Sequence, residues 1–206
     1  MNCDQYLYRS IVGDCGIRLD GTVICWASTA DSLYSSSQIV MPPAEMRFTQ
    51  LVQTGREGVA CGVTVAGSIS CWGQILDADG VRLPYTIPPE GQFSEIISRS
   101  QNIENGTIMR LCGLHSDGTI KCWGEMIDHF DSTSSFLRPP DGRFTNIDGG
   151  RANFCGVRED GELVCWGDGE VELPAGPFRS VKVAPTAACG CGARPDGSVE
   201  CWGCEF

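Results

Sequence analysis

Apolar and polar residues alternate along this chain in short runs, and the runs come in pairs around a turn. In the first pair, Ile17 and Val23 are apolar positions on either side of Asp20-Gly21. Asp-Gly between two alternating runs is the strongest short-range signal of a β-hairpin. The pattern recurs four more times, with Ala66-Gly67 in place of Asp-Gly in the second copy, and no segment has convincing helical periodicity. It therefore predicts an all-β chain with five hairpins, over 15-26, 61-72, 112-123, 155-166 and 191-202.

The turn of each hairpin is set by a glycine six positions after its first cysteine. These glycines are Gly21, Gly67, Gly118, Gly161 and Gly197. A three-residue loop with glycine last, a type I turn followed by a glycine bulge, places the two cysteines of a hairpin opposite each other. Opposed positions have Cβ atoms about 4.5–5.5 Å apart, and local twist brings them within disulfide reach. We therefore predict five disulfides: Cys15–Cys25, Cys61–Cys71, Cys112–Cys122, Cys155–Cys165 and Cys191–Cys201.

A tryptophan follows the second cysteine in every copy, at Trp26, Trp72, Trp123, Trp166 and Trp202. Strand alternation puts Ile17 and Val23 on the face of the cysteines and the tryptophan on the other face, which begins polar. We predict that the cysteine side is core and that the indole caps the opposite side. The glycine after the first cysteine is diagonal to the indole and would leave room for it. Five tryptophans at one repeat position indicate a structural packing role.

A second pattern, Phe-x-x-aliphatic, precedes four of the hairpins and predicts one more strand in each unit. It begins at Phe48, Phe93, Phe144 and Phe178, each after one or two prolines that mark a turn. The first unit lacks both the phenylalanine and the prolines. First cysteines of successive units are 36 to 51 residues apart, so insertions fall in the connecting loops. A repeat of this length is typical of solenoids, propellers and arrays.

Written in full, the repeat is Cys-Gly-aliphatic-x-x-Asp-Gly-x-aliphatic-x-Cys-Trp-Gly after Phe-x-x-aliphatic. It resembles the regulator of chromosome condensation repeat, in the cysteine-bearing version of bacterial secreted proteins and of the ectodomains of crinkly-type plant receptor kinases. The resemblance covers nearly the whole chain. It implies a single β-propeller domain over 1-206, with about five short blades, each with a disulfide-pinned hairpin. Propellers of this family usually have seven blades, and this chain has motifs for five.

The acidic balance of the chain argues against two classes of partner. It has 15 lysines and arginines against 26 aspartates and glutamates, a formal charge of −11. Nucleic acids and anionic membranes attract clusters of Lys and Arg. The apolar runs are also far shorter than a membrane span. We therefore expect no nucleic-acid partner and no membrane insertion.

The thirteen cysteines indicate the compartment, because paired cysteines persist where the surroundings are oxidising. Zinc sites use close Cys-x2-Cys pairs, often with histidine, whereas the pairs here are ten positions apart and the chain has only two histidines. We predict an extracellular protein, secreted or on the cell surface, with no metal and no cofactor. Its one Asn-x-Ser/Thr sequon, at Asn105, predicts N-glycosylation.

Three cysteines, Cys3, Cys189 and Cys204, lie outside the hairpin pairs. If the units form a ring, a Cys3–Cys204 bond would close it and leave Cys189 unpaired or available to another molecule. If they do not, unpaired strand edges and spare cysteines lead to head-to-tail assembly. Two other readings stay open. Cys201-x-x-Cys204 has the form of a thiol redox motif, and the four cysteines Cys189, Cys191, Cys201 and Cys204 could make a tetrahedral zinc site.

Candidate catalytic groups do not cluster in the sequence. Asp and Glu are scattered, and the Asp of each Asp-Gly is a turn residue. His115 takes a place held by Arg or Thr in the other hairpins, so we expect it to face solvent. We therefore predict a non-catalytic propeller that binds another protein or builds an assembly. A glycan-binding propeller and a propeller-type enzyme inhibitor are the alternatives.

Overall fold

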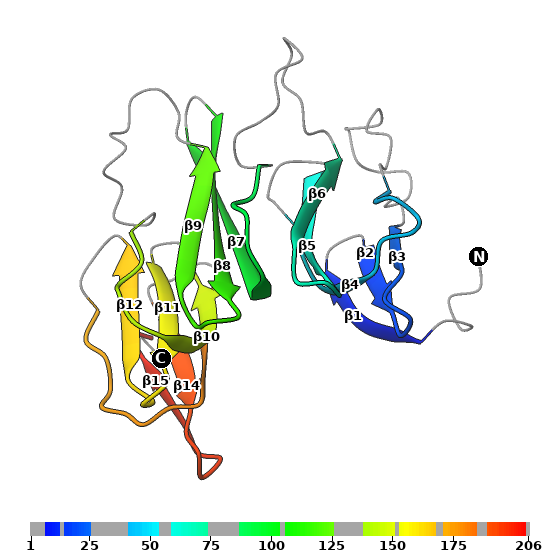
Figure 1. The fold of residues 1–206 in the computed structure, drawn as a ribbon. Coiled ribbons are helices and arrows are strands. Elements are labelled where there is room, and N and C mark those ends of the chain that lie inside the picture. The colour runs from blue at the N-terminus through cyan, green and yellow to red at the C-terminus, as the bar shows by residue number, and fades with distance from the viewer. Residues whose placement is uncertain are drawn as a thin grey trace.

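Five small antiparallel sheets follow one another in chain order (Figure 1). The computed structural model describes residues 7–12, 15–25, 41–53, 59–73, 87–103, 106–125, 138–150, 153–167, 171–184 and 189–204, with the backbone alone at 100–103, 106–108 and 125. No helix occurs within these ranges. The all-β prediction, with a disulfide-pinned hairpin in each of five units, is confirmed.

Each sheet has three strands in sequence order. The first sheet is β1 (Tyr8–Val12), β2 (Cys15–Arg18) and β3 (Val23–Cys25), and the second is β4 (Phe48–Gln53), β5 (Val59–Thr64) and β6 (Ile69–Gly73). The third is β7 (Phe93–Ile103), β8 (Gly106–His115) and β9 (Ile120–Glu125), and the fourth is β10 (Phe144–Gly149), β11 (Asn153–Arg158) and β12 (Leu163–Gly167). The last is β13 (Ser180–Val183), β14 (Gly190–Ala193) and β15 (Val199–Trp202). The extra strand predicted from Phe-x-x-aliphatic is therefore present, and β1 supplies it in the first sheet without a phenylalanine.

The hairpins turn where Asp-Gly predicts. Gly21 has a φ of +83°, a left-handed conformation that favours glycine, and its N–H donates to Arg18 O at 2.9 Å. Asp20 Oδ1 accepts the Thr22 hydroxyl at 2.6 Å and the Thr22 N–H at 2.9 Å. These two bonds, the hydroxyl first, lower the pKa of Asp20. Cys15 and Cys25 are direct cross-strand partners, which confirms the three-residue loop.

Every hairpin carries the disulfide expected of it, with the two Cα atoms 4.0 Å apart in each. This short separation is close to that of a cross-strand pair without backbone hydrogen bonds between its members. The staples therefore follow from register, since the strands already hold the two cysteines side by side.

Neighbouring sheets pack face to face, and the same two faces meet at all four interfaces. The cysteine face of a sheet carries its disulfide and two apolar partners, such as Cys155, Val157 and Leu163 in the fourth sheet. The tryptophan face carries the aromatic and aliphatic residues of the first strand together with the indole, such as Val181 and Trp202 in the last sheet. These residues form one buried cluster, and three equivalent clusters join the other neighbours. The prediction that only the cysteine side is core is wrong, because the preceding sheet covers the tryptophan face.

In the second to fifth sheets, the glycine after the first cysteine makes room for a phenylalanine, and not for the indole as we predicted. A Cβ on Gly113 would lie 2.5 Å from Phe93 Cδ1, in the first strand of the same sheet. The indole instead lies over the residue before the first cysteine, as Trp202 does over Gly190. The same close approach to phenylalanine occurs at Gly62, Gly156 and Gly192.

Three of these phenylalanines are also covered by a polar side chain at the end of the middle strand or just after it: His115, Arg158 and Arg194. The guanidinium of Arg158 lies 5.2 Å from the Phe144 ring centre, a cation–π contact. His115 places its ring centre 4.1 Å from that of Phe93. Burial, and then the charge of Lys121, lower the pKa of His115. His115 is therefore partly buried against Phe93, and it is not the freely solvated side chain that we expected.

The turn glycine of one sheet also binds the next sheet. The phenylalanine N–H that opens a first strand donates to the carbonyl of the preceding turn glycine. The bonds are Phe48 to Gly21 at 2.8 Å, Phe93 to Gly67 at 2.7 Å, Phe144 to Gly118 at 2.7 Å and Phe178 to Gly161 at 2.8 Å. Each hairpin turn therefore fixes where the following sheet begins.

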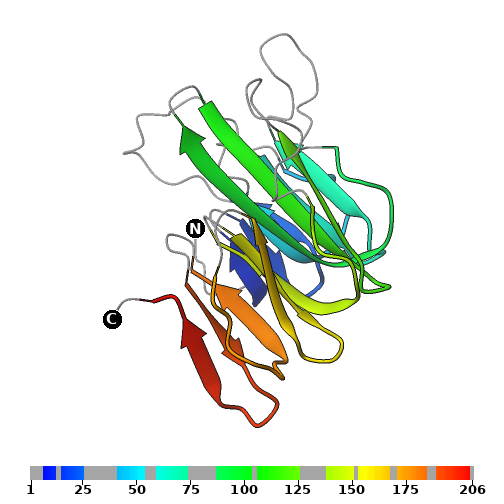
Figure 2. The ribbon, with the colours of Figure 1, turned by 90° about the vertical axis from the view of Figure 1, so that its left-hand side faces the viewer.

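Together the sheets form an arc, with the first strands of neighbouring sheets side by side (Figures 1 and 2). The first sheet stands at one end of the arc and the last sheet at the other. Among the described strands, no packing comparable to that between neighbours joins β1–β3 to β13–β15. The two end sheets therefore each have one face without a neighbouring sheet.

Candidate functional site

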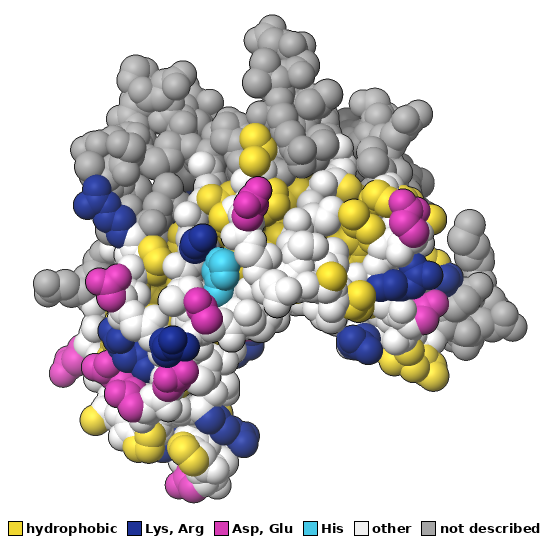
Figure 3. Space-filling view, in the orientation of Figure 1, with side chains coloured by type: hydrophobic (Ala, Val, Ile, Leu, Met, Phe, Trp, Pro, Cys, Tyr) yellow, Lys and Arg dark blue, Asp and Glu magenta, His cyan; other side chains and the backbone are white. Residues whose placement is uncertain are grey.

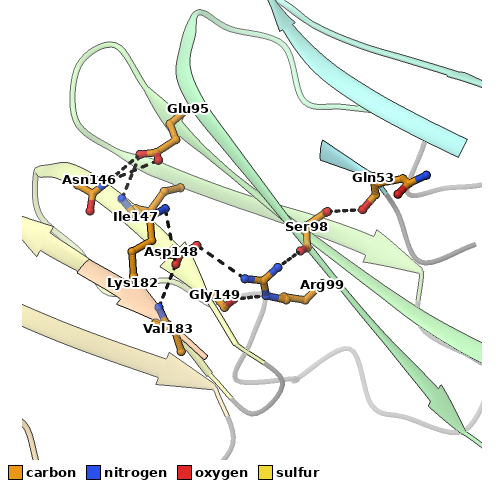
Figure 4. A network of polar contacts seen from close by, with 10 residues as sticks. All are labelled: Gln53, Glu95, Ser98, Arg99, Asn146, Ile147, Asp148, Gly149, Lys182 and Val183. Atoms are coloured by element: carbon orange, nitrogen blue, oxygen red, sulfur yellow. Dashed lines mark hydrogen bonds and ion pairs between the residues drawn. The ribbon is translucent and has the colours of Figure 1, made fainter. Parts of the chain in front are cut away.

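Polar side chains of the first strands connect each sheet to the next, as Figure 4 shows for part of this network. Three of them hold the third position of a Phe-x-x-aliphatic segment and accept the backbone N–H of the aliphatic residue in the following sheet. The bonds are Gln50 Oε1 with Ile96 N–H at 2.7 Å, Glu95 Oε2 with Ile147 N–H at 3.2 Å, and Asn146 Oδ1 with Val181 N–H at 2.8 Å. At three of the four interfaces the repeat therefore supplies an acceptor to an edge strand that would otherwise leave a donor unpaired.

Asp148 is the most heavily contacted acid of the network. Its Oδ2 accepts the Val183 N–H at 2.9 Å and lies 3.7 Å from Lys182 Nζ. Its Oδ1 lies 3.7 Å from a terminal nitrogen of Arg99, whose Nε donates to the carbonyl of Gly149 (Figure 4). Two cations therefore balance a buried carboxylate, as burial of a charge requires.

The charge of Glu95 is less well compensated than that of Asp148. Burial raises the pKa of Glu95, the bond from the Ile147 N–H opposes the rise, and the nearby charge of Asp148 adds to it. Asn146 Nδ2 also lies 3.3 Å from Glu95 Oε2. Glu95 is thus a partly buried acid whose hydrogen bonds point into the interface.

Sequence reasoning missed this network. The expectation that acidic residues form no constellation is wrong, because the arc brings Glu95 and Asp148 together with Arg99 and Lys182. A signal was available in the polar third residue of the Phe-x-x-aliphatic segments. What it binds could not be inferred, since the donor lies on the next sheet. The acceptors are satisfied by backbone N–H groups, so the network joins sheets and has the character of a structural element.

The cysteine face of the last sheet is uncovered. Val199 is 65% exposed, whereas the equivalent Leu163 in the fourth sheet is 6% exposed. A Cβ on the turn glycine Gly197 would meet nothing within 4 Å, whereas one on Gly161 would meet Pro177 at 2.6 Å. The last sheet therefore presents the surface that a following sheet covers everywhere else in the arc.

The first sheet presents the complementary surface. Ile11 holds the position of the aliphatic residue in the later first strands, opposite Gly16 as Ile147 is opposite Gly156. Ile11 is 61% exposed and Ile147 is fully buried. Hydrophobic side chains are at the surface at both ends of the arc (Figure 3). Among the described residues, no sheet packs on the side of the first sheet that corresponds to the tryptophan face, or on the cysteine face of the last sheet.

The predicted structural tryptophans divide into buried and partly exposed residues. Trp72, Trp166 and Trp202 are buried between sheets. Trp123 packs against the second sheet's cluster and also borders a groove of about 490 Å³ formed with Pro88, Pro89 and Pro139. Trp26, Cys3 and the glycosylation candidate Asn105 lie outside the described residues, so the predictions about them stay predictions.

The positions of the C-terminal cysteines fit neither a thiol redox motif nor a tetrahedral zinc site. Cys201 is bonded to Cys191, so the Cys201-x-x-Cys204 segment contains one free thiol. Within the described ranges, no group of three or more His, Cys, Asp and Glu side chains is placed to hold a metal ion. Cys189 and Cys204 are free, partly buried thiols.

No protein-family model and no curated protein matches the chain. Among solved structures, it is similar to the CRINKLY WD40 ectodomain of the Arabidopsis thaliana receptor kinase ACR4, with a TM-score of 0.57 and 22% identity over 92% of this chain and 64% of that one. It is also similar to the entire ectodomain of the Physcomitrella patens receptor kinase CR4, with a TM-score of 0.59 and 23% identity over 91% of this chain and 49% of that one. It is also similar to the computationally designed protein Ika8, with a TM-score of 0.50 and 16% identity over 92% of this chain and 55% of that one.

These likenesses establish the fold as that of a propeller-type repeat. The chain spans 64% and 49% of the two receptor-kinase ectodomains. No described segment is a helix long and apolar enough to cross a lipid bilayer.

Proposed function

We propose that this chain is a non-catalytic, extracellular assembly module with the repeat of the regulator of chromosome condensation, and that its two end faces bind further copies of itself head to tail. The observation that carries the proposal is the pair of bare end faces. At all four internal interfaces a cysteine face meets a tryptophan face. One molecule exposes one of each, so the partner of matching shape and chemistry is a second copy.

The backbone of the end strands supports the same pairing. Ser180 holds the acceptor position in the last sheet, opposite Ala193 as Asn146 is opposite Val157. Ile11 holds the position of the residue that donates its N–H at the internal interfaces. A copy docked in the repeat geometry brings these two positions together. Because the two surfaces differ, the contact is heterologous and leads to a closed ring or an open filament.

The disulfides support the extracellular location, and the contacts of the polar side chains support a non-catalytic role. Five disulfides are typical of an oxidising, extracellular setting. The two plant structures that the chain resembles are receptor-kinase ectodomains. The best-connected polar residues accept backbone N–H groups or balance Asp148, which supports a structural role and not catalysis. No specific contact in the described part favours the glycan-binding or inhibitor alternatives.

A single substitution is enough to test an end face. Burying a Val or Ile side chain contributes roughly 1.5–3 kcal/mol, and a charge placed there would have to be desolvated as well. Val199→Glu therefore removes the docking of the last sheet. Val65 is the matched control, because it is 66% exposed and lies in the turn of the second hairpin, away from both ends.

The measurement is sedimentation velocity over a range of protein concentrations. We expect the wild type and Val65→Glu to associate with rising concentration and Val199→Glu to stay monomeric, with all three equally folded by circular dichroism. A wild type that is monomeric at every concentration contradicts the proposal, and so does equal association of Val199→Glu. Binding of glycan by a monomeric wild type would favour the alternative.

A further inference from the structure

The end of the last hairpin holds two cysteines that no other hairpin has. Cys189 comes directly before β14 and Cys204 comes two residues after β15. Gly190 and Trp202 are cross-strand partners, so both cysteines lie at the same end of the hairpin. At the equivalent positions the fourth hairpin has Asn153 and Asp168. The pair is therefore a feature of the last sheet and not of the repeat.

The backbone directs the two side chains toward each other. The Ala184 N–H donates to Cys189 O at 2.8 Å, which continues the β13–β14 pairing and fixes Cys189 in place. Gly203 has a φ of +66°, which turns the chain after Trp202. The Cys204 thiol lies 3.5 Å from Trp202 O, so the chain folds back over the strand end.

The two thiols lie close to each other. An interaction with the Cys189 thiol, and then burial, raise the pKa of Cys204. Both side chains are partly buried and neither is bonded to another cysteine. Alternate residues of a strand share a face, so Cys189 is on the side of Cys191, which is the uncovered cysteine face. Small oxidants can therefore reach the pair.

We propose that Cys189 and Cys204 form a sixth disulfide, which closes the free end of the last hairpin in place of a bond between Cys204 and Cys3. The oxidant is a small disulfide such as oxidised glutathione. One cysteine thiolate attacks the glutathione disulfide and releases a glutathione thiolate. The second cysteine thiolate then attacks the mixed disulfide and releases the other. Two cysteine thiols are oxidised and one glutathione disulfide is reduced to two thiols.

The bond would hold β15 where the arc offers no support. Three of the four residues of β15 are exposed, because no sheet follows it. Trp202, the one buried residue of that strand, is seated on Gly190 beside the two cysteines. A link between Cys189 and Cys204 therefore keeps the indole in place and preserves the uncovered face.

Peptide mapping tests the proposal. The protein is treated with oxidised glutathione, alkylated, and cut with chymotrypsin after Trp202, which separates Cys201 from Cys204. We expect peptide 203-206 to be linked to the peptide that contains Cys189, with fragmentation between Cys189 and Cys191 assigning the link. The free thiols should fall from three to one, since ten of the thirteen cysteines are in hairpin disulfides.

Two variants make the result decisive. In Cys189→Ser, peptide 203-206 should be released with an alkylated thiol. In Cys204→Ser, amide hydrogen exchange of β15 should be faster than in the oxidised wild type while the other sheets are unchanged. A link from peptide 203-206 to Cys3, or an alkylated Cys204 in the oxidised wild type, overturns the proposal.

Discussion

Glu95 offers the sharpest test of how the sheets are joined. Its Oε2 accepts the N–H of Ile147, which is fully buried in the next sheet. Glu95→Ala removes the acceptor and leaves that donor facing an apolar interface. Glu95→Gln is the matched variant, because Gln50 already performs the same task one sheet earlier.

The magnitude follows from the lost hydrogen bond. A buried donor left without a partner costs about 1–3 kcal/mol. For a chain of 206 residues each kcal/mol lowers the melting temperature by roughly 2–4 °C. We therefore expect Glu95→Ala to melt roughly 2–12 °C below the wild type at neutral pH. Glu95→Gln should keep most of this stability, since its amide oxygen can accept the same N–H.

The pH dependence separates the charge from the hydrogen bond. Burial raises the pKa of Glu95 above its ordinary value of 4.5, so the folded protein keeps this proton to higher pH than the unfolded chain. Between the two values the folded state binds more protons, and the free energy of unfolding falls as pH rises. This penalty is absent below the unfolded pKa and complete above the folded one. Glu95→Gln cannot ionise, so its stability relative to the wild type should increase as pH rises from about 4 to neutral.

The assay is urea unfolding with the disulfides intact, for the wild type and both variants, at several pH values from acid to neutral. Gln50→Glu is the reciprocal control and should introduce a similar loss on raising the pH. Equal destabilisation by Glu95→Ala and Glu95→Gln at every pH would refute the acceptor role. So would an alanine variant as stable as the wild type.

Three further predictions concern packing and the staples. Gly113→Ala places a Cβ 2.5 Å from Phe93 Cδ1 and should lower the free energy of unfolding by about 1–3 kcal/mol through overpacking. Adding Phe93→Leu to this variant should restore part of the lost stability. If urea unfolding shows that the losses of the two substitutions simply add, the contact is contradicted. Trp166→Ala removes a buried indole from between two sheets and should cost about 3–5 kcal/mol, whereas a much smaller shift in melting temperature would place the residue outside the core. Replacing both Cys155 and Cys165 by alanine opens a short loop and should cost about 2–3 kcal/mol in denaturant unfolding, and an unchanged midpoint would mean that the staple adds nothing.

Local features of the fold could be predicted from the sequence. Asp-Gly and the ten-residue cysteine spacing determined the hairpin register, since the turn and the two strands lie within one short segment. The third strand also followed from a local signal, Phe-x-x-aliphatic. These elements depend on neighbours in sequence, and the structure places Cys155 opposite Cys165 as expected.

Features that depend on the next sheet could not be predicted in this way. An isolated hairpin has one core side, so the burial of Trp166 on the opposite side was not anticipated. Glu95 and Asp148 seemed unrelated because their donors, Ile147 and Val183, belong to other strands. Stacking of the sheets creates these contacts.

The C-terminal cysteines show the same limit at smaller scale. Pairing Cys204 with Cys3 assumed that the ends of the chain meet. Cys3 lies outside the described residues, so that pairing stays a prediction, and the turn at Gly203 places Cys204 near Cys189 at the same end of the hairpin. A single left-handed glycine after a strand decides this, and its φ is not evident from the sequence.

The most direct test of head-to-tail binding is to mix two variants, each blocked at one end. Val199→Glu keeps a working first sheet, and Ile11→Glu keeps a working last sheet. Each variant alone should be monomeric by sedimentation equilibrium, because neither has both faces. Their equimolar mixture should form a one-to-one dimer and nothing larger, since only one complementary pair of faces remains. A mixture that stays monomeric while the wild type associates would contradict the pairing of these two faces.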